Sequence, residues 1–385
     1  MPMPGQSAAI VPFEVEIPES VVTDARERLR RTRWPEPETV GDWSQGTPAA
    51  YLRGLCRYWL EDYDWRAAQR RLNRFPQFRT EIDGLPVHFV HARSPHPGAI
   101  ALLITHGWPG SVTEFQKVVA PLTDPVSFGG NASDAFHVVC PSLPGFGFSG
   151  KPERTGWGAE RIADAWDQLM RRLGYARYAA QGGDWGARIT MALARRHPQQ
   201  VIGIHLNMVP FRAPVGAEDL TEADRRAVAA LAGHRAQGSA YAAIQATRPQ
   251  SIGYGLTDSP AALAGWIIDK FEAWSDCGGD PGTVFTEDEL LDNLLMYWLP
   301  ATGASAARLY WESFATATGD DSRITVPTGC SVFPADIYRP TRRLAEPQFA
   351  DLRHWNELDR GGHFAALEQP AVFVDEVRAT FRGLR

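Results

Sequence analysis

A short glycine-rich segment, residues 181–186 (QGGDWG), has the residue types and spacing to do chemistry. Gly182 and Gly186 stand two positions before and two positions after Asp184. This pattern is typical of a nucleophile elbow, a strained strand-to-helix turn that exposes one reactive side chain. Asp184 would be the nucleophile. An aspartate at the start of a helix is also a common cap, so the motif alone leaves a structural role open.

A carboxylate nucleophile suits one kind of reaction. Attack by Asp184 on a saturated carbon would form an ester whose carbonyl belongs to the enzyme, and water can cleave that ester. A serine in its place would form an ether that the enzyme could not release. The sequence therefore predicts alkyl transfer from an electrophilic carbon, followed by hydrolysis. A serine esterase is disfavoured, because no G-x-S-x-G motif is present and Ser149, in FGFSGK, lacks the required spacing.

Residues 106–111 (HGWPGS) directly follow a predicted buried strand. In hydrolases built on parallel sheets, such a loop supplies one oxyanion N–H and the residue after the nucleophile supplies the other. We therefore assign the backbone N–H groups of Trp108 and Trp185 to an oxyanion hole, with their indoles lining the substrate site. We expect His106 to be structural. The alternative for this segment is a glycine–proline turn that takes no part in catalysis.

The general base and its acid partner should follow later strands. His363, in RGGHF, stands between the last predicted strand and the last predicted helix, where a triad histidine is expected. Asp336 follows the preceding strand and is our candidate for the acid. Asp320 and Asp321 are rivals that precede that strand, and Glu357 is a rival that ends the next one.

Strands alternating with helices must position these side chains. Such alternation indicates an α/β fold with a mostly parallel sheet covered by helices on both faces. The expected strands are 99–105, 136–141, 175–181, 201–207, 326–333 and 352–358, and the expected helices are 111–122, 158–173, 186–197 and one from about 369.

Two further segments flank or interrupt this core. Before it we expect a loose tail over 1–12, helices over 20–33, 48–62 and 65–74, and a hairpin that turns at Asp83-Gly84. Between the two parts of the core, the segment 210–325 is almost wholly helical and is predicted to form an inserted lid. The chain therefore divides into an N-terminal region (1–94), a first core part (95–209), the lid (210–325) and a second core part (326–385).

Composition excludes several classes of protein. The 385 residues carry a formal net charge of −6, whereas nucleic-acid binders usually show a basic patch. The longest apolar run, 99–104, is far shorter than the roughly 20 residues of a membrane helix. The N-terminus has no signal-peptide pattern, and the four cysteines form no CxxC pair for zinc or redox chemistry. We expect a cytoplasmic protein with no membrane anchor, metal or cofactor.

Taken together and in order, the motifs resemble a known family. HGWPGS, GGDWG, a late FPAD and RGGHFAALEQP resemble those of the α/β-hydrolase-fold epoxide hydrolases of the microsomal type. The segments RLRRTRWP (28–35) and FPQFRTEIDGLPVHFVHARS (75–94) resemble the N-terminal domain of that branch. The resemblance spans about residues 10–382. It implies an α/β-hydrolase core with an inserted helical lid and an N-terminal wrapping domain.

The resemblance also implies a reaction and two further site residues. Tyr241 and Tyr310 match the two lid tyrosines that hold and protonate the epoxide oxygen in this family. Epoxide and water would give a vicinal diol through an ester on Asp184, hydrolysed by water that the pair His363 and Asp336 activates, without any cofactor. The family resemblance further implies a homodimer. The aromatic-rich composition favours a bulky or aromatic epoxide.

Other interpretations stay open at this point. A haloalkane or haloacid dehalogenase uses the same kind of elbow aspartate and would hold the leaving halide with tryptophan N–H groups. A non-catalytic binder that kept the fold is a second alternative. Each lid tyrosine could also be a packing aromatic, for which Tyr254, Tyr297 and Trp298 serve as comparisons. The sequence does not distinguish detoxification, catabolism and biosynthesis.

Overall fold

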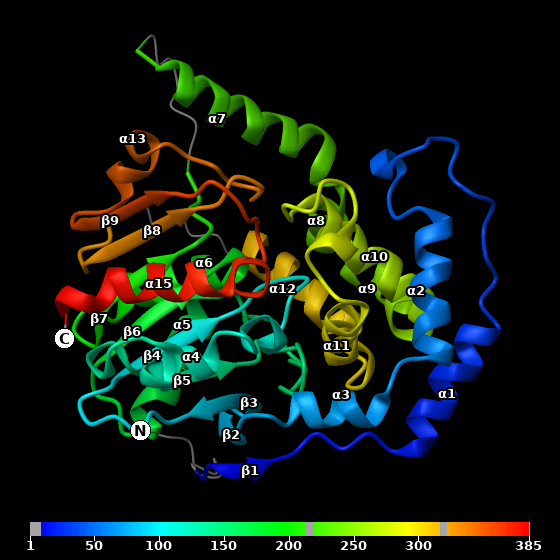
Figure 1. The fold of residues 1–385 in the computed structure, drawn as a ribbon, viewed down its shortest axis with the longest axis horizontal. Coiled ribbons are helices and arrows are strands. Elements are labelled where there is room, and N and C mark those ends of the chain that lie inside the picture. The colour runs from blue at the N-terminus through cyan, green and yellow to red at the C-terminus, as the bar shows by residue number, and fades with distance from the viewer. Residues whose placement is uncertain (1–8, 212–218, 316–321, 385) are drawn as a thin grey trace.

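The computed structural model describes residues 9–211, 219–315 and 322–384. Its strands form one sheet in the order β1-β2-β3-β5-β4-β6-β7-β8-β9, shown in Figure 1. The strands β5, β4, β6, β7, β8 and β9 run parallel, and β1, β2 and β3 are added antiparallel at one edge. The strands are β1 Val11–Phe13, β2 Gln77–Ile82, β3 Leu85–Ala92, β4 Ile100–Thr105, β5 Phe136–Pro141, β6 Tyr178–Gly182, β7 Val201–Leu206, β8 Thr328–Val332 and β9 Leu352–Glu357.

The predicted alternation of strands and helices is confirmed, and it explains where a site can form. The chain leaves β4 toward β5 on one side and reaches β6 on the other, so the strand order reverses beside β4. Ligands bind at such a reversal, outside the carboxyl ends of the strands. The core helices are α4 Val119–Thr123, α5 Ala159–Arg172, α6 Asp184–Arg196, α13 Arg342–Ala345, α14 Ala365–Glu368 and α15 Pro370–Phe381.

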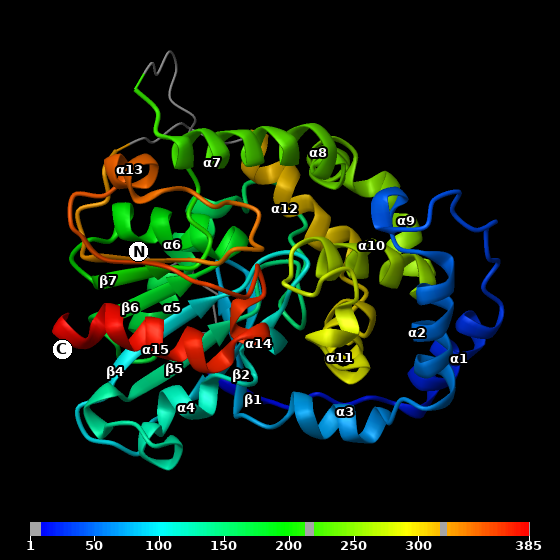
Figure 2. The same ribbon diagram turned by 45° about the horizontal axis from the view of Figure 1, so that its top comes forward.

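The segment between β7 and β8 is helical, as predicted for a lid. Figures 1 and 2 show most of its helices grouped beside the sheet, with α7 reaching from the lid back toward α13. Leu231 of α7 packs there with Phe211 and Leu344. The lid helices are α7 Glu222–Gly233, α8 Ala240–Thr247, α9 Pro249–Asp258, α10 Pro260–Ala273, α11 Glu287–Trp298 and α12 Gly303–Ala315.

The N-terminal region joins the sheet to the lid. Its strands extend the sheet, while α1 (Glu19–Arg30) and α2 (Ala49–Glu61) contact α10 of the lid. Figure 2 shows these two helices on the same side of the molecule as the lid. The next helix, α3 (Trp65–Leu72), contacts α11. The domain boundaries that we drew from the sequence stay predictions.

Two local expectations were wrong. Residues 111–122 do not form one helix but a 3-10 turn over Val112–Phe115 followed by α4. Pro121 explains the break, because a proline is tolerated in the first turn of a helix, where it stands in α4, but not in a helix interior. Val11 and Pro12, expected to lie in a loose tail over 1–12, belong to β1 and pair with β2 instead. Residues 1–8 lie outside the described part of the chain.

The hairpin turn is confirmed, since Asp83 and Gly84 both adopt positive φ, 52° and 77°, between β2 and β3. All four cysteines are free and buried. Over the ranges that the structure describes, every helix falls short of the length and apolar character that a membrane crossing requires.

Candidate active site

The turn that carries Asp184, the predicted nucleophile, is a strained junction between β6 and α6. Asp184, the first residue of α6, has a φ of 50°, in the left-handed region that non-glycine residues rarely adopt. The flanking glycines are needed for close approach. A β-carbon on Gly182 would collide with the carbonyl of Gly186, and one on Gly186 would collide with the carbonyl of Thr105. The predicted elbow geometry is therefore present at Asp184.

The loop after β4 lies against Asp184. The backbone N–H of Trp108 donates a hydrogen bond of 2.8 Å to Oδ1 of Asp184. Gly107 makes this approach possible, because a β-carbon there would collide with the same carboxylate. Trp185 is the second residue of α6, so its N–H belongs to the first turn, where no acceptor exists within the helix. Its role as the second donor stays a prediction.

His106 supports this loop from within. Its Nδ1 donates to the carbonyl of Gly107 over 2.9 Å, and its Nε2 accepts from the N–H of Leu143 over 3.2 Å. These two bonds need a neutral ring. Burial lowers the pKa of His106 to about 4, which keeps the ring neutral.

Two residues of α11 donate hydrogen bonds to the loop at 106–111. The sequence analysis did not single them out for this contact. The amide of Asn293 donates to the carbonyl of Pro109 over 2.9 Å. The hydroxyl of Tyr297 donates to the carbonyl of Gly110 over 2.6 Å. Tyr297 is thus a loop support, in keeping with its use as a comparison for the lid tyrosines. No motif in the sequence linked α11 to the loop at 106–111.

The structure brings His363 and Asp336 to Asp184, the predicted nucleophile. Nδ1 of His363 lies 2.7 Å from Oδ1 of Asp336, and its Nε2 lies 3.5 Å from Oδ2 of Asp184. The N–H of Ile337 also donates to Oδ1 of Asp336, over 2.7 Å. Burial by itself would lower the pKa of His363. The charges of Asp336 and Asp184 and the hydrogen bonds with them outweigh burial, so this pKa lies well above its ordinary value.

The rivals for the acid lie elsewhere. Glu357 is exposed at the end of β9, where its carboxylate accepts a hydrogen bond of 3.0 Å from the indole of Trp355. Asp320 and Asp321 lie outside the described residues.

The two lid tyrosines lie close together and line one cavity with Asp184. Tyr241 comes from α8 and Tyr310 from α12, and their ring centroids lie 5.8 Å apart. The ring of Tyr241 stacks on Trp108 at 5.0 Å, while Tyr310 meets Trp185 edge-on at 4.8 Å. Burial and then the charge of Asp184 raise the pKa of Tyr241. Burial raises the pKa of Tyr310 as well, and the neighbouring Tyr241 and Asp184 raise it further. Both phenols are therefore protonated and can donate a hydrogen bond.

The comparison aromatics differ from this pair. Tyr254 is 68% exposed on α9, away from any buried site. Trp298 packs beneath the guanidinium of Arg28, at 5.9 Å from the ring centre. Neither is placed to meet a substrate at Asp184.

A cavity of about 390 Å³ opens onto Asp184 and both tyrosines. Its volume lies within the range of small-molecule sites. The wall is mostly aromatic and apolar, with three basic side chains. The lining residues are Asp184, Trp185, Arg188, Met208, His234, Arg235, Ser239, Tyr241, Ala242, Ala243, Ala246, Tyr310, Phe314, Ile337 and Tyr338.

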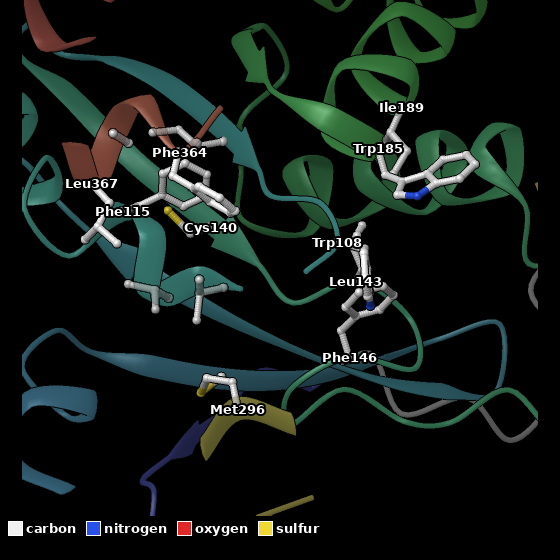
Figure 3. Packing of buried hydrophobic residues seen from close by; sticks show 14 of the residues in the cluster. Trp108, Phe115, Cys140, Leu143, Phe146, Trp185, Ile189, Met296, Phe364 and Leu367 are labelled. Atoms are coloured by element: carbon white, nitrogen blue, oxygen red, sulfur yellow. The ribbon is translucent and has the colours of Figure 1, made fainter. Parts of the chain in front are cut away.

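Buried apolar side chains pack around the segment that carries His363. Figure 3 shows Phe115, from the 3-10 turn after β4, close to Phe364, which follows His363 in the chain. The ring of Phe364 also stacks on Phe271 of α10, with centroids 4.1 Å apart. The segment that carries His363 and Phe364 is therefore packed between the core and the lid.

Glu114 is a further residue that sequence reasoning missed. It belongs to the 3-10 turn and lines a small cavity together with Asp184 and His363. Burial, the largest cause, raises the pKa of its carboxyl group to about 8. The S-x-x-E spacing from Ser111 is a helix-capping signature that could have drawn attention to it. Within the described ranges, no group of three or more His, Cys, Asp or Glu side chains is arranged to hold a metal ion.

Comparison with known families and proteins agrees with this geometry. Residues 10–115 match the family model described as epoxide hydrolase N terminus, and residues 100–252 match the model of the alpha/beta hydrolase fold. A protein of Stigmatella aurantiaca is 52% identical over 377 residues, which cover 98% of this chain and 86% of that protein. Epoxide hydrolase 1 of Oryctolagus cuniculus is 33% identical over 411 residues, which cover 98% of this chain and 90% of that protein. The crystal structure of juvenile hormone epoxide hydrolase from Bombyx mori superimposes with a TM-score of 0.91 at 32% identity, covering 99% and 96%.

Proposed function

The chain belongs to the epoxide hydrolases of the α/β-hydrolase fold, and we propose that it opens its epoxide through a covalent ester on Asp184. The observation that carries this proposal is the set of contacts around one carboxylate. Oδ1 of Asp184 accepts from the N–H of Trp108, and Oδ2 faces His363. The lid tyrosines and Asp184 line the same cavity.

In the first half-reaction, Tyr241 and Tyr310 bind the epoxide oxygen. One carboxylate oxygen of Asp184 attacks a ring carbon from the side opposite the breaking C–O bond. The ring oxygen takes a proton from a phenol as that bond breaks, which leaves a hydroxyalkyl ester and a phenolate. Ring strain makes the carbon reactive, so this step draws on no metal or organic cofactor.

In the second half-reaction, His363 removes a proton from water, and the water oxygen attacks Cγ of Asp184. The N–H of Trp108, with that of Trp185, would stabilise the resulting oxyanion. Collapse breaks the bond between Cγ and the ester oxygen, and the leaving diol oxygen takes the proton from His363. The carboxylic acid left on Asp184 returns a proton to the phenolate, which restores both groups.

The carboxylate mechanism has an isotopic test. Because water attacks Cγ, the new oxygen of the diol comes from Asp184 and not directly from solvent. A single turnover with excess enzyme in ¹⁸O-water should give unlabelled diol, whereas many turnovers should give labelled diol. Labelled diol in the first turnover would contradict the covalent mechanism.

The proposed substrate is a bulky or aromatic epoxide. The aromatic lining of the cavity supports this, including Trp185, Phe314 and Tyr338. The experiment is a comparison of kcat/KM for styrene oxide with that for a small aliphatic epoxide, and a preference for the small one would contradict the proposal. Release of halide from a chloroalkane, without diol from any epoxide, would instead indicate the dehalogenase alternative.

We also propose a cytoplasmic location and a homodimer. Four free, buried thiols are in keeping with a reducing compartment. The dimer rests on the family resemblance alone. Fractionation of the source cells and sedimentation of the purified chain test the two statements separately.

A further inference from the structure

Three basic side chains line the cavity onto which Asp184 opens. Arg188 belongs to α6, and His234 and Arg235 belong to the turn between α7 and α8. Among the described residues, Asp184 is the only acidic side chain in this lining. Burial, the largest cause, lowers the pKa of His234 below its ordinary value, so the positive charge of the cavity comes from the two arginines. The two half-reactions leave both of them without a role.

Arg188 lies one helical turn beyond the nucleophile. Residues four apart occupy the same face of an α-helix and are separated by about 6 Å along its axis. The guanidinium of Arg188 lies 5.4 Å from the ring centre of Trp185, which lines the same cavity. Its charge acts inside the site, because it opposes the rise in the pKa of Tyr241 that burial and Asp184 cause.

Arg235 approaches the same cavity from the lid. It belongs to the π-helical turn His234–Gly238, a kind of turn that is frequent at functional sites. Arg188 and Arg235 are both exposed, and Phe314 of α12, which also lines the cavity, is 52% exposed. Asp184 and Tyr310 are buried. The two arginines and Phe314 therefore mark the outer end of the cavity, and Asp184 and Tyr310 mark its inner end.

The two arginines differ from their neighbours in what they pair with. Arg196 of α6 pairs with Asp164, and Arg226 of α7 pairs with Glu222. Over the ranges that the structure describes, neither Arg188 nor Arg235 forms an ion pair with a carboxylate. A single exposed arginine without a partner is common. Two of them that line one cavity from separate elements, where the acidic lining is the nucleophile itself, indicate an anion that enters with the substrate.

We propose that the substrate is an epoxide that also carries a carboxylate, and that Arg188 and Arg235 bind this carboxylate at the outer end of the cavity. This inference rests on the proposed function and narrows the bulky or aromatic epoxide to an acid. Guanidinium groups bind a carboxylate through two parallel N–H bonds, which fix its orientation. A carboxylate held about one helical turn from Asp184 would direct the epoxide ring toward the nucleophile.

A purely electrostatic role for the arginines makes a different prediction. Their positive charge would stabilise the phenolate that Tyr241 becomes during ring opening. Such an effect would act on every epoxide alike, whether or not the substrate carries a charge. Recognition of a carboxylate would instead favour the acidic substrate over a neutral one of the same shape.

The test compares para-carboxystyrene oxide with para-carbamoylstyrene oxide, which have nearly the same shape and differ in charge. The measured quantity is the ratio of kcat/KM for the acid to kcat/KM for the amide. A hydrogen bond to a charged group in a partly exposed site predicts a ratio of about 10 or more in the wild type. Arg188→Met and Arg235→Met should each lower this ratio, and the double variant should bring it close to one.

Arg226→Met is the matched control, because it removes the same charge from an exposed position of α7 that does not line the cavity. It should keep the wild-type ratio. A ratio close to one in the wild type, or a wild-type ratio in the double variant, would overturn the inference. The first of these measurements needs no variant, so it holds even if an arginine variant does not fold.

Binding of an unreactive analogue separates this inference from the proposed reaction. Calorimetry with para-ethylbenzoate and para-ethylbenzamide should show tighter binding of the acid to the wild type. That preference should be lost in the double variant and should weaken as salt is added, because the arginines are exposed. Equal binding of acid and amide would count against the carboxylate site. A preference for the acid without diol from either epoxide would instead overturn the proposed function.

Discussion

Nε2 of His363 lies 3.5 Å from Oδ2 of Asp184, while Nδ1 of the same ring lies 2.7 Å from Oδ1 of Asp336. The imidazole therefore stands between two carboxylates, which together raise its pKa against the effect of burial. Formation of the ester would neutralise Asp184 and remove one of these two charges. The pKa of His363 should then fall, so that the ring becomes a base in the step that needs one.

The first prediction follows from this change of charge. Ester hydrolysis requires neutral His363, so its rate should rise with pH and level off above the pKa that His363 has in the ester. That pKa should be lower than the one measured by NMR titration of His363 in the free enzyme. Single-turnover decay of the ester, measured over pH 5 to 9, gives the pKa that His363 has in the ester. Equal values in the two states would show that Asp184 does not control the base.

The second prediction concerns the separation of the two half-reactions. His363→Gln removes the base but leaves Asp184 and the N–H of Trp108 in place, so the ester should form and accumulate. Intact-mass spectrometry should show the protein heavier by the mass of one epoxide. Asp184→Ala is the control and should show neither adduct nor turnover. A His363→Gln protein that turns over at the wild-type rate would contradict the assignment of the base.

The third prediction concerns the lid tyrosines. Tyr241→Phe and Tyr310→Phe each remove one donor to the epoxide oxygen, and general acid assistance is typically worth about 10²- to 10⁴-fold. Each variant should slow ester formation, and the double variant should slow it further, while decay of a preformed ester changes little. Tyr254→Phe is the matched control on an exposed position. Equal rates for the double variant and the wild type would remove both residues from the mechanism.

The sequence predicted the parts of the site that depend on local backbone chemistry. Gly182 and Gly186 indicate the elbow because a side chain would not fit at either position. The order of the strands along the chain then predicts that His363 and Asp336 lie close together. Glu114 was missed because its place beside Asp184 depends on the space left by Gly110, four residues away in the chain but adjacent in space. The support from α11 was missed for a similar reason, since Asn293 and Pro109 are brought together only by the docking of the lid.

A buried ionic cluster connects the N-terminal region to this lid. Asp292 of α11 accepts from the hydroxyl of Tyr63 over 2.5 Å and pairs with Arg71 of α3 over 2.7 Å. The side chain of Asp292 is only 4% exposed, so its charge depends on these partners. The next residue, Asn293, donates a hydrogen bond to the carbonyl of Pro109 in the loop at 106–111. Two consecutive residues of one helix therefore link the N-terminal region to the loop that contacts Asp184.

The fourth prediction tests this link with Arg71→Met. The variant leaves the buried carboxylate of Asp292 without its cation, a change that typically costs about 3–5 kcal/mol. We expect the lower end, because the side chain of Arg71 is 33% exposed. Arg70→Met is the matched control on the same helix, since Arg70 is 72% exposed and its pair with Asp64 is worth at most about 1 kcal/mol. Urea unfolding measures the stability of both variants.

The same variant should also affect ring opening before it unfolds. If α11 positions the oxyanion loop, loosening Asp292 displaces Asn293 and with it the N–H of Trp108 that contacts Asp184. Ester formation by Arg71→Met should then be slower than in Arg70→Met at temperatures where both remain folded. A destabilised Arg71→Met protein with unchanged ester formation would show that the N-terminal region supports the fold but not the nucleophile.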